Sequence, residues 1–182
     1  VIEVGAVRIE DGVIGDRFQG LMDPGMRINS FIESYTGITN AMVAEAPPCE
    51  EVMRDLKPFI GASPVVAHNS SFDRRFLIAE WKRLRFDCDN PFACSMLTAR
   101  RLYPEAPNHK LGTLVAYNRL DNDGVFHRAL ADAEMTARLW LHMLQQIDEH
   151  YTVGTMRFSA MQALAKVSKA AVPRFFAQLR ET

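Results

Sequence analysis

The apolar and polar positions of the first 22 residues predict a β-hairpin. VIEVGAVRI (1–9) is rich in β-branched residues, and VIGDRFQGLM (13–22) reads as the returning strand. Between them stands Asp11-Gly12, a pair that favours the tight turn of a two-residue hairpin. Pro24-Gly25 then ends the second strand.

The next apolar positions predict two helices and a buried strand, after a loop that extends to about residue 37. ITNAMVAEA predicts a short helix with Thr39 as its N-cap. PPCEEVMRDLKPFIG predicts a second helix, because its prolines suit a helix start and its apolar residues recur at helical spacing. PVVAH (64–68) is a short apolar run that predicts a buried strand.

Helices account for most of the remaining pattern. SFDRRFLIAEWKRLRF (71–86) predicts an amphipathic helix that a preceding serine can cap. Shorter helices are expected at about 94–102 and 111–117, and a long helix with one apolar face at about 129–147. From about residue 151 a basic, helix-prone tail follows. The order of these elements predicts an α/β fold, in which an antiparallel hairpin leads into parallel strands flanked by helices.

Composition narrows the class of protein. Hydrophobic residues make up 48% and charged residues 24% of the 182 positions, which is typical of a globular domain. No apolar run approaches the roughly 18 residues that span a bilayer, and three cysteines without metal-type spacing indicate reduced thiols. We therefore expect a cytoplasmic protein with no membrane partner.

The charges are distributed unevenly along the chain. Residues 151–182 contain five Lys and Arg residues and one acid, whereas the remainder has more acids than cations. An acidic body is unusual for a protein that only coats nucleic acid, because phosphate attraction requires surplus Lys and Arg. Such a body suits an enzyme that holds cations with carboxylates.

Two of the predicted helices begin with a carboxylate. In VVAHNSSFDRRF the predicted strand is followed by His68, Asn69 and, in the first helical turn, Asp73. In HRALADAEMT the loop residue His127 precedes a helix that carries Asp132 in its opening turns. Taken singly, each acid could simply stabilise a helix N-terminus, and the other residues could belong to ordinary loops. Together, two carboxylates and an imidazole supply the groups needed for divalent-cation chemistry on phosphate esters.

These stretches resemble the 3′–5′ exonuclease superfamily, in its histidine-type branch with four metal-binding acids, which includes the DNA polymerase III epsilon subunit and RNase T. His68-Asn69-x-x-Phe72-Asp73 looks like the second motif of the family, and His127-x-x-x-x-Asp132 looks like the histidine form of the third. VIEVGAVRIEDG, TGIT and ARRLYP…HKLGTL also look like family sequence, in the expected order. The resemblance covers residues 1 to about 147.

The resemblance implies an RNase H-like mixed sheet and a 3′–5′ exonuclease that releases nucleoside 5′-monophosphates by a two-metal-ion mechanism. It implies that Asp73 and Asp132 are ligands of two Mg²⁺ or Mn²⁺ ions. His127 would be the general base of the reaction. The implied partner is the 3′ end of single-stranded DNA or RNA, and a DNA polymerase subunit is a further candidate.

Three residues of the second motif have two open interpretations. His68, Asn69 and Phe72 would bind the terminal nucleotide or shape the site around it. A purely structural role for all three is the alternative. The motifs do not distinguish DNA from RNA, because contacts to the 2′-hydroxyl decide that preference.

The sequence departs from the family at its first motif. That motif, Asp-x-Glu-Thr, lies on the strand before VIEVGAV, and Glu3 does not replace it because Glu3 lies on the following strand. We therefore expect the first strand of the sheet and two further acidic ligands upstream of Val1 in the natural protein. The alternative is a non-catalytic nucleic-acid-binding or polymerase-associated module of the same fold.

The tail suggests a division of the chain into two parts. We expect an exonuclease domain over residues 1–150 and a basic helical extension over residues 151–182. The preferred interpretation of the extension is one or two helices that pack on the body with a solvated basic face. The alternative is a contact for the nucleic-acid strand or for a partner protein. The sequence indicates no oligomeric state.

Overall fold

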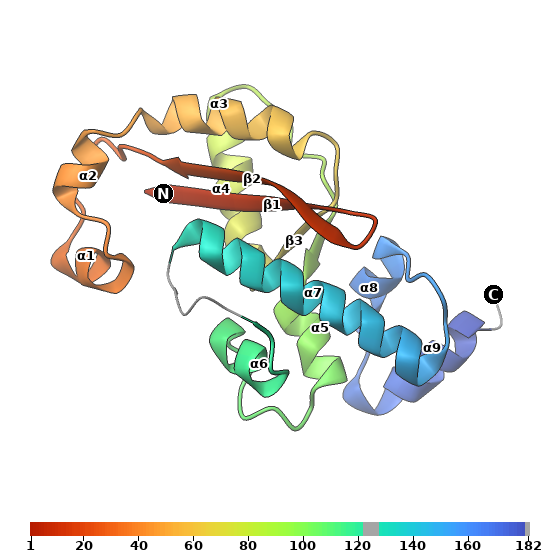
Figure 1. Cartoon of the computed structure of the whole chain (residues 1–182). Helices are drawn as coiled ribbons and strands as arrows, with labels where there is room; N and C mark the ends of the chain where they lie inside the picture. Colours follow the sequence, from red (N-terminus) through yellow and green to blue (C-terminus); the bar gives the residue numbers. More distant parts are fainter. Residues whose placement is uncertain (122–127, 181–182) are drawn as a thin grey trace. The chain divides into compact units, whose positions relative to one another are not determined.

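The computed structural model describes residues 1–121 and 128–180, which fold into two compact units (Figure 1). The first, here called the hairpin unit, comprises Val1–Ser63, Arg74–Asp89 and Asp123–Glu134. The second, here called the parallel-sheet unit, comprises Pro64–Asp73, Asn90–Asn122 and Met135–Thr182.

The predicted hairpin is confirmed. Strand β1 (Glu3–Glu10) pairs antiparallel with β2 (Val13–Leu21), in a register that runs from Glu3 opposite Leu21 to Glu10 opposite Val13. Asp11 and Gly12 connect them with φ angles of 49° and 79°. Positive φ at both central residues is the conformation whose twist matches the flanking strands, which explains why Asp-Gly stands here.

Helices α1 (Ser30–Thr36), α2 (Asn40–Ala44) and α3 (Cys49–Ile60) follow in the hairpin unit. Thr39 caps α2 as predicted, accepting the Met42 N–H at 3.2 Å. The prediction of a loop before residue 37 was wrong for α1. This helix is seven residues long and buries none of its residues, so its few apolar positions do not define a core-facing stripe. Only the Asn29 N-cap and the left-handed Gly37 after its last turn mark it locally.

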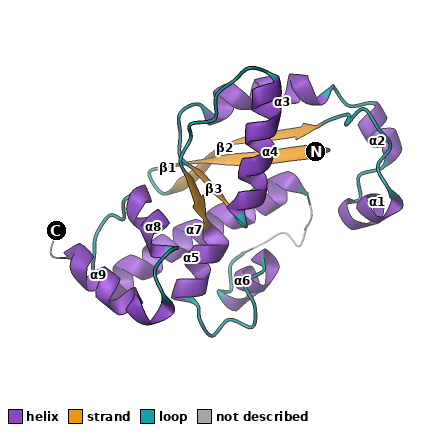
Figure 2. Cartoon of the chain, turned by 180° about the vertical axis from the view of Figure 1, so that it is seen from behind, coloured by secondary structure: helices purple, strands orange, loops and turns teal. Residues whose placement is uncertain are grey.

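Helix α4 (Ser70–Arg83) begins in the parallel-sheet unit and continues into the hairpin unit from Arg74. Within the hairpin unit, α3 contacts β2, and α4 crosses the same hairpin (Figures 1 and 2). The Trp81 side chain of α4 is fully buried, and its indole N–H donates to the Met53 carbonyl of α3 at 3.3 Å. Trp81, Leu56 and Met22 therefore form the centre of this core.

The parallel-sheet unit is built around β3 (Val65–Ala67) and β4 (Phe92–Cys94), which pair in parallel. The sequence predicted β3 but not β4. Both strands are three residues long, but β3 contains two β-branched valines, whereas Phe92-Ala93-Cys94 contains no β-branched residue. The helices of this unit are α5 (Ser95–Leu102), α6 (Leu111–Tyr117), α7 (Ala129–Tyr151, from Met135 onward), α8 (Phe158–Leu164) and α9 (Val172–Arg180), with a 3₁₀ turn η1 at Lys169–Ala171. Leu139, Met143 and Ile147 of α7 are fully buried in its core.

The predicted mixed α/β class is confirmed, since an antiparallel pair and a parallel pair of strands are flanked by helices. Over the described residues, the two pairs form separate hydrogen-bonded ladders. No helix in this part of the chain has the length and apolar character needed to cross a membrane.

Candidate functional site

The corner between β3 and α4 carries the second predicted motif. Strand β3 ends at Ala67, and α4 begins at Ser70, so the chain reverses within two residues. Asn69 has a φ of 70°, a left-handed conformation that asparagine tolerates better than most residues. Its carbonyl oxygen accepts the Phe72 N–H at 3.0 Å. This turn places Asp73 in the first turn of α4, as predicted.

The His68 ring holds this corner through both of its nitrogens. Nε2 lies 2.9 Å from the carbonyl oxygen of His109, and Nδ1 lies 2.9 Å from the Ser95 hydroxyl. Because a carbonyl can only accept, Nε2 carries the proton and Nδ1 accepts from Ser95. Burial lowers the pKa of His68 and favours this neutral form. In this arrangement both polar atoms of the ring are engaged by the protein itself.

The hydrogen-bond chain continues beyond His68. His109 Nε2 donates to the Tyr103 carbonyl at 3.0 Å, and Ser95 is the fully buried first residue of α5. His68 therefore ties the end of β3 to the start of α5 and to the segment before α6. No pattern in the sequence predicted that Ser95 and His109 belong to this corner. His109 lies inside the family-like HKLGTL stretch, which was the available signal.

Asp73 and Phe72 differ in their exposure to solvent. Burial raises the pKa of the Asp73 carboxyl, and a hydrogen bond from its own backbone N–H opposes that shift only in part. Among the described residues, Asp73 takes part in none of the ion pairs. The neighbouring residue Phe72 is 52% exposed. The corner thus combines a shielded carboxylate with an exposed aromatic residue.

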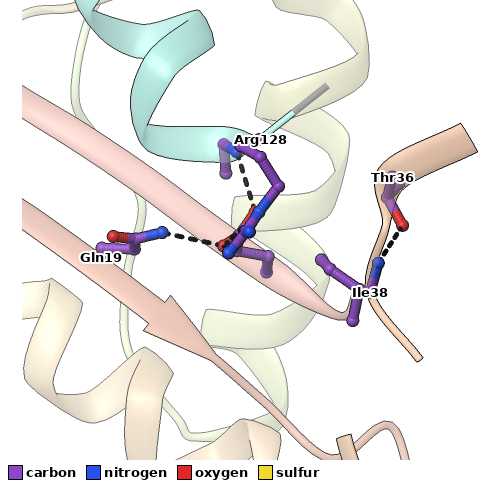
Figure 3. A network of polar contacts seen from close by, with 6 residues as sticks. Gln19, Thr36, Ile38 and Arg128 are labelled. Atoms are coloured by element: carbon purple, nitrogen blue, oxygen red, sulfur yellow. Dashed lines mark hydrogen bonds and ion pairs between the residues drawn. The ribbon is translucent and has the colours of Figure 1, made fainter. Parts of the chain in front are cut away.

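The start of α7, which carries Asp132, is fixed in another way. The Glu3 carboxylate of β1 accepts the Ala129 N–H at 2.9 Å, so a strand residue caps the first turn of the helix. The Arg128 guanidinium donates to the same carboxylate, at 2.7 Å from Nη2 and 3.2 Å from Nε. Gln19 of β2 adds a further hydrogen bond at 2.9 Å. Figure 3 shows Arg128 and Gln19 converging on this point.

Electrostatics explain why Glu3 stays charged although only 5% of its side chain is exposed. Burial acts to raise the pKa of Glu3, but the hydrogen bonds from Arg128, Ala129 and Gln19 outweigh it and hold the pKa below its usual value. Glu3 thus acts as a positioning residue for α7.

Figure 3 also shows a separate contact at the end of α1, where the Thr36 hydroxyl accepts the Ile38 N–H at 3.1 Å.

Gly5 permits the close approach of β1 to α7. A Cβ at this position would lie 2.5 Å from the Ala129 carbonyl oxygen and closer still to the Leu130 backbone nitrogen. Arg17 of β2 forms an ion pair with Glu134 in the second turn of the helix. The Asp132 N–H donates to the Arg128 carbonyl at 3.0 Å, which places Asp132 in the first turn of α7, as predicted.

The structure brings His68, Asn69, Phe72 and Asp73 together in the parallel-sheet unit and places Asp132 in the hairpin unit. His127, the predicted general base, lies outside the described residues. Within the described part of the chain, no three His, Cys, Asp or Glu side chains gather as a metal-binding group. Besides Ser95 and His109, sequence reasoning missed the contacts of Glu3, Gly5 and Arg128 at the start of α7. A lone acid and a glycine inside a β-branched strand were the only local signals for Glu3 and Gly5.

Sequence comparisons relate the chain to known proteins. It matches the model of an exonuclease family, that of RNase T, over residues 1–140. It is 35% identical over 155 residues to the DNA polymerase III subunit epsilon of Aquifex aeolicus (strain VF5), covering 85% of this chain and 76% of that protein. It is 38% identical over 151 residues to the PolC-type DNA polymerase III of Bacillus subtilis (strain 168), covering 82% of this chain. The chain spans about a tenth of the length of such PolC-type relatives.

Solved structures give the same picture of the fold. The structure of Exonuclease X in complex with 5′-overhanging duplex DNA is similar with a TM-score of 0.71 and 27% identity, over 91% of this chain and 90% of that one. The nuclease domain of 3′hExo, a DEDDh family member bound to rAMP, has a TM-score of 0.61 at 19% identity, over 80% of this chain and 92% of that one. The second likeness concerns the fold alone.

Proposed function

Because the chain belongs to the RNase T family of exonucleases, we propose that it is a 3′–5′ exonuclease that hydrolyses phosphodiester bonds at the 3′ end of a nucleic acid. The match over residues 1–140 carries this proposal, since it includes Asp73, His127 and Asp132. Each turnover would release one nucleoside 5′-monophosphate.

Asp73 and Asp132 would hold two divalent ions, Mg²⁺ or Mn²⁺, together with two acidic residues expected upstream of Val1. The donor chemistry fits, because carboxylate oxygens are the ligands that these ions prefer. The shielded Asp73 carboxylate, which has no ion-pair partner among the described residues, is the observation that supports this assignment. When bound, the ions would lower the pKa of a water molecule and stabilise the leaving 3′ oxygen.

Four further residues of the chain would have separate roles in the reaction. His127 would take a proton from the attacking water, because an imidazole titrates near neutral pH. Phe72, an exposed aromatic residue beside Asp73, would stack on the terminal nucleobase. Asn69 would shape the same site through the turn that it forms. His68 would hold that turn in place rather than contact the nucleotide, since both of its ring nitrogens are engaged.

We favour DNA as the substrate and a DNA polymerase subunit as a partner. The relatives include a DNA polymerase III subunit and PolC-type polymerases, and Exonuclease X was solved with duplex DNA.

A degradation assay on the protein with its natural N-terminus tests the proposal. Single strands of DNA and RNA, labelled at either end, are incubated with Mg²⁺ or Mn²⁺, with and without chelator. We expect stepwise 3′ shortening that chelator abolishes and that falls by more than about 100-fold in Asp73→Asn, Asp132→Asn and His127→Ala. Even the mutation of a residue that only orients a metal ligand typically lowers metal affinity or activity 10–100-fold.

Glu149→Gln is the matched control, because Glu149 is an exposed acid near the other end of α7. It should retain wild-type activity. A folded protein that degrades neither DNA nor RNA under any of these conditions would reject the enzyme and leave the non-catalytic binding module.

A further inference from the structure

The C-terminal segment carries an unbalanced charge. From Thr152 to Arg180 the sequence has no Asp or Glu, and it has five cations: Arg157, Lys166, Lys169, Arg174 and Arg180. The segment forms α8, η1 and α9 in the parallel-sheet unit and lies beyond the family match, which ends at residue 140. The chemistry of the active site gives it no role.

All five cations are exposed. Among the residues that the structure describes, none of the five forms an ion pair or a side-chain hydrogen bond. Some exposed cations elsewhere in the chain have an acid beside them, as Arg54 has Asp55, so that their fields partly cancel. Across this segment no acid opposes the positive field.

The segment is an ordered scaffold. Phe176 of α9 is fully buried and stacks on Tyr151 of α7 with 3.9 Å between ring centroids. Arg101 of α5 donates from Nε to the Val167 carbonyl at 2.8 Å and fixes the connection between α8 and η1. Figures 1 and 2 show α8 and α9 beside the C-terminal half of α7. The apolar residues thus face the core, while the cations face solvent.

We propose that residues 157–180 form a surface that binds the phosphate backbone of the substrate strand. The inference rests on the proposed function, which makes a nucleic acid the substrate. Backbone binding needs surplus cations and no apolar centre. A protein interface usually has an apolar, aromatic-rich centre. None of the exposed large hydrophobic side chains of the described residues belongs to this segment, which favours a phosphate backbone over an acidic protein.

The test measures binding without turnover. The Kd of the full-length protein for a fluorescein-labelled oligothymidylate is measured by anisotropy in EDTA, at several salt concentrations. In the test variant, Lys166, Lys169, Arg174 and Arg180 are all replaced by Gln. We expect at least about tenfold weaker binding at 0.1 M salt. The slope of log Kd against log salt should fall by about 2 to 3, since each single-strand phosphate contact contributes about 0.7.

Two further variants test whether a loss of affinity is specific to the charge of this segment. Replacing Arg27, Arg54, Lys82 and Arg85 by Gln removes the same charge from exposed positions of the hairpin unit and should change Kd by less than about threefold. The double variant Lys166→Arg, Lys169→Arg keeps the charge and should bind like the wild type. Far-UV circular dichroism and thermal unfolding verify that each variant folds.

Equal weakening in the test variant and the hairpin-unit control, or no weakening in either, would overturn the proposed surface. The degradation assay reports separately on the exonuclease. A protein that binds through the segment but never hydrolyses would refute the proposed function alone. A protein that hydrolyses while the test variant binds normally would refute the surface alone.

Discussion

Neutral, partly buried hydrogen bonds hold the start of helix α4, whereas a partly buried ion pair holds the start of helix α7. At the first helix, the His68 ring joins Ser95 to the His109 carbonyl. At the second, the Glu3 carboxylate joins Arg128 to the Ala129 N–H. Both arrangements place an aspartate in the first turn of a helix, where the helix dipole favours negative charge. The comparison shows that the same local result can depend on different forces, which respond differently to mutation and pH.

The largest effect is expected from Gly5→Ala at the start of α7. The added Cβ would meet backbone atoms of Ala129 and Leu130, which cannot rotate away as a side chain would. We expect a loss of at least about 3 kcal/mol in the free energy of unfolding, at the upper end of overpacking costs. Urea denaturation measures it. Gly15→Ala on the neighbouring strand is the control, because its Cβ would meet nothing closer than the Arg8 carbonyl oxygen at 3.9 Å. Equal stability of the two variants would contradict the steric role of Gly5.

Glu3→Gln should have the next largest effect. The substitution leaves Arg128 without its counter-charge, and we expect a loss of about 2 kcal/mol, below the usual cost for a fully buried pair because Arg128 is 34% exposed. Glu10→Gln is the matched control on the same strand. Glu10 is 71% exposed, so its loss should cost less than about 0.5 kcal/mol. A cost for Glu3→Gln no larger than that of the control would show that the ion pair does not hold α7.

His68→Gln should cost about 1–2 kcal/mol at neutral pH, because it breaks two hydrogen bonds of a partly buried ring. His150→Gln, at the exposed end of α7, should change stability by less than about 0.5 kcal/mol. Chemical denaturation of both variants at neutral pH measures the difference. If the two substitutions cost the same, His68 does not support the corner.

The pH dependence separates the two helix starts. The folded pKa of His68 lies below its usual 6.5, so the unfolded chain binds the proton first, and the stability that His68 contributes is lost as pH falls from that value through the folded pKa. The folded pKa of Glu3 lies below its usual 4.5, so its contribution is lost only in more acidic solution. Between about pH 7 and 5, the cost of His68→Gln should therefore shrink while that of Glu3→Gln stays constant. If instead the cost of Glu3→Gln shrank over this range and that of His68→Gln stayed constant, the assignment of neutral hydrogen bonds to α4 and of the ion pair to α7 would be wrong.

Tyr103→Phe should have the smallest effect. The Tyr103 hydroxyl is buried and, within the described residues, has no hydrogen-bond partner, and burial raises its pKa. Removing the hydroxyl should leave the free energy of unfolding unchanged or raise it by up to about 1 kcal/mol. The Tyr103 backbone carbonyl would still accept the hydrogen bond from His109 Nε2. Tyr117→Phe, at a 45% exposed position, is the control. A clear loss of stability in thermal unfolding of Tyr103→Phe, with none in the control, would show that the hydroxyl is satisfied after all.

Local signals made much of the fold predictable. Asp11-Gly12 fixes the hairpin turn, and the Thr39 side chain caps the helix that follows it, because both act within four residues of chain. The resemblance to 3′–5′ exonucleases, which the family match confirms, rests likewise on short motifs with fixed spacing. Helix α1 escaped prediction because it is short and buries no residue, and strand β4 because its three residues include no β-branched side chain.

The sequence by itself determined the family, the order of the main elements and the first-turn positions of Asp73 and Asp132, since periodicity and capping are encoded locally. Only the tertiary structure decided how those turns are held. Glu3 and Ala129 are separated by 126 positions, and His68 and His109 by 41, so no local pattern could pair them. The protonated nitrogen of His68 and the steric need for Gly5 follow from those contacts, because each depends on which backbone atoms folding brings within reach.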